Sequence, residues 1–145
     1  MKIAIGTDHR GVTLKNYLMH TITDIDWIDM GAFDQERTDY PIYAHMVVSA
    51  MLHNEADAGI LLCGSGVGMS IAANRFDGIY AALVWNEDVA RSSKEHDNAN
   101  IIVLPADFIQ AEQAAAMVRA WRKACFLGGR YQERVAMINT HGHKK

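Results

Sequence analysis

The chain has 145 residues, of which half are hydrophobic and 21% are charged, and its formal net charge is -3 at pH 7. This composition indicates one globular domain over residues 1–145, with a frayed tail from about residue 139, and it predicts no nucleic-acid or anionic-membrane partner. No apolar run approaches the roughly 20 residues of a membrane span, and two distant cysteines without a secretion signal favour a cytoplasmic protein that holds no metal.

Strands and helices are expected to alternate along the chain. Short runs of β-branched and other apolar residues predict the strands, whereas apolar residues that recur every three or four positions predict the helices. Pro41 suits the first turn of a helix, because its missing N–H has no intrahelical partner there. In chain order we expect a strand over 2–6, a helix over 12–22, a strand over 25–30, a helix over 40–53, a strand over 58–62, a helix over 71–75, a strand over 79–85, a helix over 87–94, a strand over 101–104, a helix to about residue 126 and a last helix over 130–138.

Three details are predicted for the second half of the chain. The strand over 79–85 is apolar throughout, which is typical of a strand buried on both faces of a parallel sheet. Asp107 and Gln110 have the spacing of a capping box at the start of the long helix. Cys125 is expected in the core, and that helix is expected to bury Phe108, Ala115, Val118 and Trp121.

This alternation predicts an α/β fold, a three-layer αβα sandwich around a five-stranded, parallel, Rossmann-like sheet. Ligands of such sheets bind beyond the carboxyl ends of the strands. Polar segments follow three of the expected strands, at residues 7–10, 63–68 and 86–88. Residues 96–98 instead precede the last strand, at the opposite edge, from which they can reach a site only on a neighbouring chain. We therefore expect the protein to self-associate.

The glycine-rich turn after the third strand carries the clearest chemical signal. Cys63 ends the strand, and glycines follow at every second position before the next helix. Such a turn exposes several backbone N–H groups, and the helix dipole adds partial positive charge, so negative charge above the turn is stabilised. These N–H groups should favour the Cys63 thiolate, although cysteine is more often a small buried hydrophobe. A dinucleotide fingerprint is disfavoured, because it needs glycine where Met69 stands.

Two further groups have both a structural and a functional interpretation. His9, beside Asp8 and Arg10, is either an ordinary surface histidine or part of a site at the carboxyl end of the first strand. Arg130 and Arg134 lie one helical turn apart and share a face. That face is either solvated or a clamp for a phosphate group, which paired arginines hold well.

Taken together, these segments resemble the ribose-5-phosphate isomerase B family, which includes allose-6-phosphate and galactose-6-phosphate isomerases. The matching segments are collinear from residue 1 to about residue 138 and comprise residues 5–11, 36–41, 63–74, 96–100 and 128–135. The resemblance implies an aldose–ketose isomerase of ribose 5-phosphate or a hexose 6-phosphate, in carbohydrate metabolism such as the pentose phosphate pathway. It further implies a cis-enediolate intermediate, no cofactor or metal, and a homodimer or homotetramer whose subunits share each site.

The resemblance also assigns roles by position. Cys63 matches the base that removes the proton at C2, Ser65 the hydroxyl that moves a proton between O1 and O2, and His96 the residue that assists ring opening. The backbone N–H groups of Gly64, Gly66, Val67, Gly68 and the rest of the turn to Ser70 match the anion hole for the enediolate. Asp8 and Tyr40 match contacts to sugar hydroxyls, and His9, Arg130 and Arg134 match contacts to the phosphate.

One position departs from the family pattern. Asp97 stands where the family usually has asparagine directly after the ring-opening histidine. An amide can donate a hydrogen bond to an enediolate, whereas a carboxylate repels it. Asp97 stays a substrate-binding candidate, and it motivates a second hypothesis, a non-catalytic or accessory sugar-phosphate-binding subunit, against which the retained Cys63, Ser65 and His96 argue. The basic residue that some members carry near the start of the last long helix also has no clear counterpart.

Overall fold

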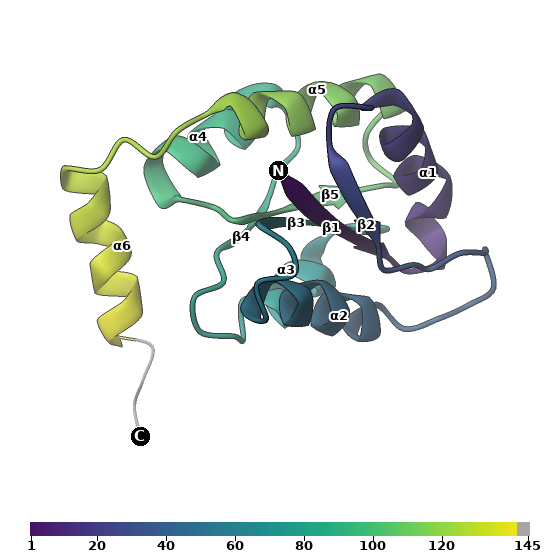
Figure 1. The fold of residues 1–145 in the computed structure, drawn as a ribbon, viewed down its shortest axis with the longest axis horizontal. Coiled ribbons are helices and arrows are strands. Elements are labelled where there is room, and N and C mark those ends of the chain that lie inside the picture. The colour runs from purple at the N-terminus through teal and green to yellow at the C-terminus, as the bar shows by residue number, and fades with distance from the viewer. Residues whose placement is uncertain (142–145) are drawn as a thin grey trace.

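The computed structural model describes residues 1–141, which form a parallel sheet between two layers of helices (Figure 1). The predicted α/β sandwich is thus confirmed. The strands are β1 (Lys2–Thr7), β2 (Asp26–Asp29), β3 (Ala58–Cys63), β4 (Ala81–Leu83) and β5 (Ile101–Pro105), in the spatial order β2-β1-β3-β5-β4. The helices are a 3₁₀ turn η1 (His9–Gly11), α1 (Val12–Thr21), α2 (Tyr40–Leu52), α3 (Val67–Ala73), α4 (Glu87–Asp97), α5 (Ala111–Lys123) and α6 (Arg130–His141).

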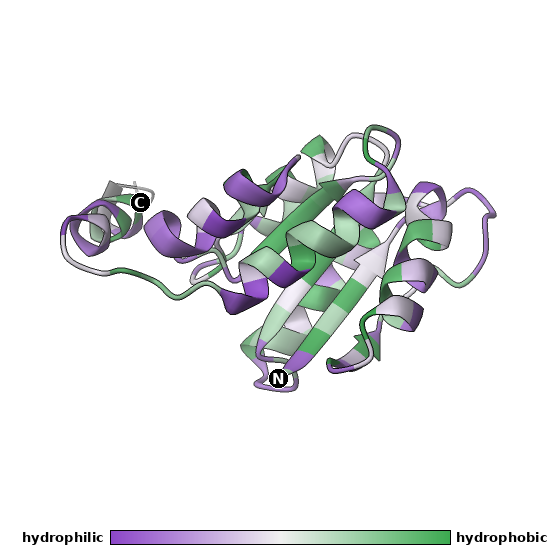
Figure 2. Ribbon diagram, turned by 90° about the horizontal axis from the view of Figure 1, so that it is seen from above, coloured by the Kyte–Doolittle hydropathy of each residue, from purple (hydrophilic) through white to green (hydrophobic). Residues whose placement is uncertain are grey.

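The central strands are apolar on both faces, and each face is covered by its own helices. Ile60 and Leu62 of β3 belong to the core under α1, α4 and α5, whereas Leu61 and Cys63 belong to the core under α2 and α3. Figure 2 shows hydrophobic residues concentrated in the sheet. Because side chains alternate along a strand, this register directs the Cys63 thiol toward the α2 and α3 side.

The prediction of a fourth strand buried on both faces is wrong. β4 is shorter than expected and lies at the edge of the sheet, with β5 as its neighbour. Ala82 and Leu83 are only half-buried as a result. After β3 the chain crosses to the outside edge and then returns to place β5 in the interior.

The long helix buries Ala115, Val118 and Trp121 as expected, but its predicted start and the expected burial of Phe108 and Cys125 are wrong. α5 begins at Ala111, and its capping pair is Gln110 with Gln113, whose Oε1 accepts the Gln110 N–H at 2.9 Å. Phe108 therefore precedes the helix and is 76% exposed. α5 ends at Lys123, so Cys125 lies beyond it and is exposed rather than in the core.

Two helices in the second half of the chain are longer than expected. α4 continues to Asp97, which places His96 in its last turn. α6 continues to His141, and the rest of the predicted tail, residues 142–145, lies outside the described residues. α6 stands apart from the sheet in both Figure 1 and Figure 2, and it contacts the last turn of α4. No helix within residues 1–141 is long and apolar enough to cross a membrane.

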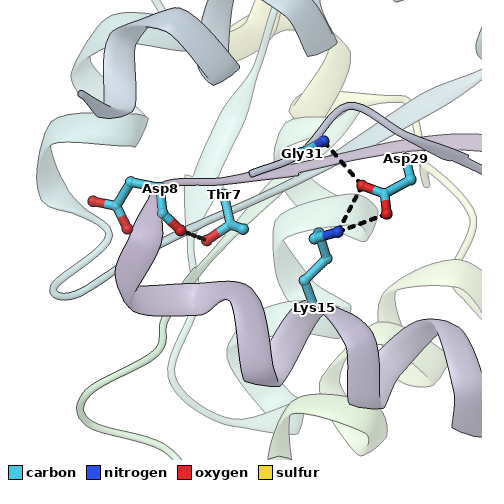
Figure 3. A network of polar contacts seen from close by, with 5 residues as sticks. All are labelled: Thr7, Asp8, Lys15, Asp29 and Gly31. Carbon is cyan, nitrogen blue, oxygen red and sulfur yellow. Dashed lines mark hydrogen bonds and ion pairs between the residues drawn. The ribbon is translucent and has the colours of Figure 1, made fainter. Parts of the chain in front are cut away.

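An ion pair between a buried lysine and a half-buried aspartate fixes the loop that follows β2 (Figure 3). The Nζ of Lys15, whose side chain is 1% exposed, donates to both carboxylate oxygens of Asp29 at 2.7 and 2.6 Å. Asp29 also accepts the backbone N–H of Gly31 at 2.9 Å. Thr7 and Ala32 complete the anchor, because the Thr7 N–H donates to the Gly31 carbonyl and the Ala32 N–H to the Thr7 carbonyl, both at 2.7 Å. The loop is thereby held against the carboxyl end of β1.

We expect Asp29→Asn to lower the free energy of unfolding by about 3 kcal/mol, because it leaves the buried Lys15 charge without its partner. The measurement is urea unfolding followed by circular dichroism. Asp88→Asn is the matched control, since Asp88 pairs with Arg91 at 3.1 Å with both side chains exposed, and exposed pairs contribute at most about 1 kcal/mol. Equal losses in the two variants would contradict this account of Lys15.

Candidate active site

The carboxyl ends of β1 and β3 bring the first candidate residues together. Thr7 of β1 pairs with Leu62 of β3, so Asp8 and Cys63 follow on neighbouring strands. Asp8 is 6% exposed, and its carboxylate accepts the Arg10 N–H at 2.9 Å, which caps η1. Figure 3 shows this carboxylate pointing away from the Lys15–Asp29 pair. The polar edge expected from the sequence is therefore present.

Backbone N–H groups of the glycine turn surround the Cys63 sulfur. The Gly66 N–H donates to Sγ at 3.1 Å, and the N–H groups of Met69 and Ser65 also interact with the sulfur. Burial raises the pKa of the Cys63 thiol, the Asp8 charge raises it further, and the three N–H groups lower it. The N–H groups thus favour the thiolate as expected, but burial prevails and the pKa of the thiol is raised from its usual value. The physical reason is that Cys63, 4% exposed, lies in the core under α3.

Two glycines of the turn are required by space and conformation. Gly66 has a φ of 77°, and a Cβ there would lie 2.5 Å from Cδ1 of Leu83. A Cβ on Gly68 would lie 2.5 Å from Cζ of Tyr40, so the Tyr40 ring packs directly on the turn. A side chain at either position would displace the turn or its neighbours. Tyr40, the first residue of α2, is thus brought against the glycine turn.

The serines of the turn differ in what they can offer a ligand. Ser65 is exposed, and its Oγ accepts the Val67 N–H at 3.3 Å. The Ser70 N–H instead donates to the Gly66 carbonyl at 3.0 Å, and the Ser70 Oγ donates to the Ala81 carbonyl at 3.4 Å. Ser70 therefore anchors α3 to β4. Its backbone N–H is already bonded within the chain and is not a free donor for the anion hole expected from the sequence.

His9 connects the turn after β1 to the loop that Lys15 anchors. Its Nδ1 lies 3.3 Å from both the backbone nitrogen and the backbone oxygen of Thr38. The Thr38 hydroxyl in turn lies 3.1 Å from the Tyr43 hydroxyl. We call the residues gathered at this end of the sheet the loop cluster, which consists of Asp8, His9, Tyr40 and residues 63–68.

The remaining candidates form a second group between α4 and α6. The rings of His96 and Tyr131 are stacked, with centroids 4.4 Å apart and planes 8° apart. The Arg130 Nη2 donates to the Tyr131 hydroxyl at 3.0 Å. The Cζ atoms of Arg130 and Arg134 lie 5.0 and 5.8 Å from the Tyr131 ring centroid, within cation–π range. We call His96, Asp97, Arg130, Tyr131 and Arg134 the helix cluster.

Tyr131 is the residue that the sequence analysis missed. It contacts three candidate residues at once, and it places His96 and both arginines on one small surface. Its position between two arginines was the available signal, but an aromatic residue on an apolar helix face is usually core. Asp97 is exposed at the last position of α4.

Within one chain, the two clusters lie at opposite ends of the sheet. Cys63 pairs with Pro105, the last residue of β5, whereas His96 precedes Ile101, the first. The rise along β5 alone separates these ends by about 13 Å. A single chain therefore does not bring His96 and the arginines to the Cys63 thiol.

Comparison with protein families gives a match over nearly the whole chain. The family model described as Ribose/Galactose Isomerase matches residues 3–138. Ribose-5-phosphate isomerase B of Escherichia coli K12 is 42% identical over 141 residues, which cover 96% of this chain and 95% of that protein.

Solved structures agree in fold as well as in sequence. A ribose 5-phosphate isomerase from Thermotoga maritima superposes with a TM-score of 0.93 at 47% identity, over 96% of this chain and 97% of that one. Ribose-5-phosphate isomerase B from Mycoplasma genitalium, with bound ribulose-5-phosphate, gives a TM-score of 0.92 at 35% identity, over 99% of this chain and 97% of that one.

Proposed function

Because the chain belongs to the ribose/galactose isomerase family and is an aldose–ketose isomerase of sugar phosphates, we propose that it interconverts ribose 5-phosphate and ribulose 5-phosphate with Cys63 as the base. One observation carries the proposal. A buried thiol and a set of fixed backbone N–H donors occupy the same turn after β3. Proton removal next to a carbonyl needs both a base and a preorganised site for the resulting anion.

The proposed reaction moves one proton at a time. The Cys63 thiolate removes the proton from C2 of the open-chain aldose, and the electron pair of that C–H bond moves to the carbonyl oxygen O1, which gives a cis-enediolate. Ser65, exposed beside the thiol, carries a proton from O2 to O1. The Cys63 thiol then returns its proton to C1, and the ketose results. The N–H groups of the turn stabilise the oxyanion while it exists.

The raised pKa of the Cys63 thiol fits a base for a weakly acidic C–H bond. A thiol with a raised pKa is ionised to a smaller extent at neutral pH, but its thiolate is a stronger base once formed. The N–H groups of Gly66 and Met69 lower the cost of forming that thiolate. The site therefore combines basicity with access to the ionised form.

The helix cluster supplies the complementary groups. Arg130 and Arg134 carry two fixed positive charges that suit a dianionic phosphate, and His9 contributes from the loop cluster. His96 assists opening of the sugar ring, while Asp8 and Tyr40 contact sugar hydroxyls. Binding the unreactive phosphate orients the carbons that react.

We further propose that two copies complete each site, as a homodimer or as a homotetramer built from such dimers. The helix cluster of one chain then faces the loop cluster of the other. Large apolar side chains in and beside the loop cluster are exposed in the single chain, among them Val67, which is 50% exposed, and Ile71, which is 62% exposed. On α6, Met137 and Ile138 are 59% and 57% exposed. A second copy would bury these surfaces.

We expect Cys63→Ser to lower kcat/KM for ribose 5-phosphate by about 10²- to 10⁴-fold, the usual effect of losing a general base. Cys125→Ser is the matched control, because Cys125 is the other free cysteine, is exposed and belongs to neither cluster. Turnover is measured by the appearance of the ketose. Allose 6-phosphate and galactose 6-phosphate are tested in separate assays as alternative substrates. Full activity of Cys63→Ser would overturn the assignment of the base. Phosphosugar binding without any turnover would favour the accessory subunit, which Asp97 motivates.

We expect two variants that are each inactive alone to recover activity when one chain of each forms a mixed dimer. Cys63→Ser and His96→Ala chains, co-expressed with different affinity tags and purified through both, form dimers with one intact and one doubly defective site. Their activity should reach about half that of the wild type, because one of the two symmetric sites is intact. Cys63→Ser chains carrying both tags are the control. Mixed dimers as inactive as either parent would show that each site lies within one chain.

A further inference from the structure

An ion pair at the glycine turn has no role in the proposed reaction. Arg10 of η1 pairs through Nη2 with Oδ2 of Asp107, in the loop between β5 and α5. β3 lies between β1 and β5 in the sheet, so the pair spans the end of β3. A Cβ on Gly64 would lie 2.8 Å from the Asp107 Oδ2 and 3.0 Å from the Arg10 Cζ. The pair thus rests directly on the residue that follows Cys63.

Backbone hydrogen bonds hold Asp107 in this place. Its N–H donates to the Gly64 carbonyl at 3.0 Å, and the Ala106 N–H donates to the Cys63 carbonyl at 2.9 Å. The Asp107 side chain is 33% exposed. A carboxylate is consequently fixed beside a turn whose N–H groups are arranged for negative charge, and like charges at such short range repel each other.

Arg10 is suited to cancel that charge. Its side chain is 57% exposed, and a guanidinium keeps its positive charge throughout the working pH range. Stability does not account for the pair, because ion pairs between exposed side chains contribute little to folding. Its placement matters instead for whatever anion approaches the Cys63 turn.

We propose that Arg10 is a positioning residue that neutralises Asp107, so that the glycine turn accepts an anionic phosphosugar. This inference rests on the proposed function and adds to it a requirement for the paired charges. Arg10 acts through Asp107 and not as a direct ligand of the substrate. Removing the carboxylate should therefore remove the need for the arginine.

The test is a double-mutant cycle with Arg10→Met, Asp107→Asn and the double variant. We expect Arg10→Met to lower kcat/KM by about tenfold or more, through KM, since an unpaired carboxylate repels the dianionic substrate. Asp107→Asn should bind the substrate at least as tightly as the wild type, because the unpaired Arg10 charge attracts the anion. The double variant should return to within about threefold of wild-type kcat/KM. The loss in Arg10→Met should shrink at high salt. Arg122→Met is the matched control, because Arg122 pairs with Asp24 away from the site.

A parallel binding measurement separates this inference from the proposed function. The dissociation constant of inorganic phosphate, measured by calorimetry, should rise in Arg10→Met and recover in the double variant, whether or not ribose 5-phosphate is turned over. A wild type inactive on ribose 5-phosphate would refute only the proposed substrate. A double variant as weak as Arg10→Met would show that Arg10 contacts the anion itself, and an unchanged Arg10→Met would show that the pair has no role. Either result would overturn the inference.

Discussion

The interaction on which the rest of the site depends is the contact between the Cys63 sulfur and the backbone N–H groups of the turn that follows it. Burial under α3 removes the sulfur from water and raises its pKa, and only those N–H groups oppose the shift while Asp8 adds to it. The donors keep their positions because Gly66 takes a φ of 77° and Gly68 leaves room for the Tyr40 ring. The same geometry that solvates a thiolate can therefore stabilise an oxyanion on the substrate.

The topology of the sheet separates the loop cluster from the helix cluster within one chain. β3 delivers Cys63 to the carboxyl edge, while α4 carries His96 back to the amino end of β5 before that strand begins. Tyr131 then joins His96 to Arg130 and Arg134 on a helix that stands apart from the sheet. Self-association is a requirement of the proposed mechanism, because the proposed base and the arginines proposed to bind the phosphate lie at opposite ends of the sheet within one chain.

The order of strands and helices could be predicted because apolar periodicity is local, and so could the polar edge after β1 and β3. What depended on distant packing was missed. β4 lies at an edge because pairing joins segments far apart in sequence. α5 is capped by Gln110 with Gln113, while Asp107 pairs with Arg10, which is distant in sequence. The direction of the Cys63 pKa shift depends on how closely α3 covers the sulfur, and the role of Tyr131 depends on where α6 meets α4. None of these can be read from a short stretch of sequence.

Hydrogen exchange at the reacting carbons tests the central claim most directly. Ribose 5-phosphate and ribulose 5-phosphate would be held at equilibrium with the enzyme in heavy water for many turnovers and analysed by NMR. Proton transfer through the Cys63 thiol predicts that solvent deuterium accumulates at C2 of the aldose and C1 of the ketose. Cys63→Ser should lose this exchange together with isomerisation. Sustained isomerisation without any deuterium at these carbons would indicate a direct hydride shift and would contradict the role of Cys63 as a base.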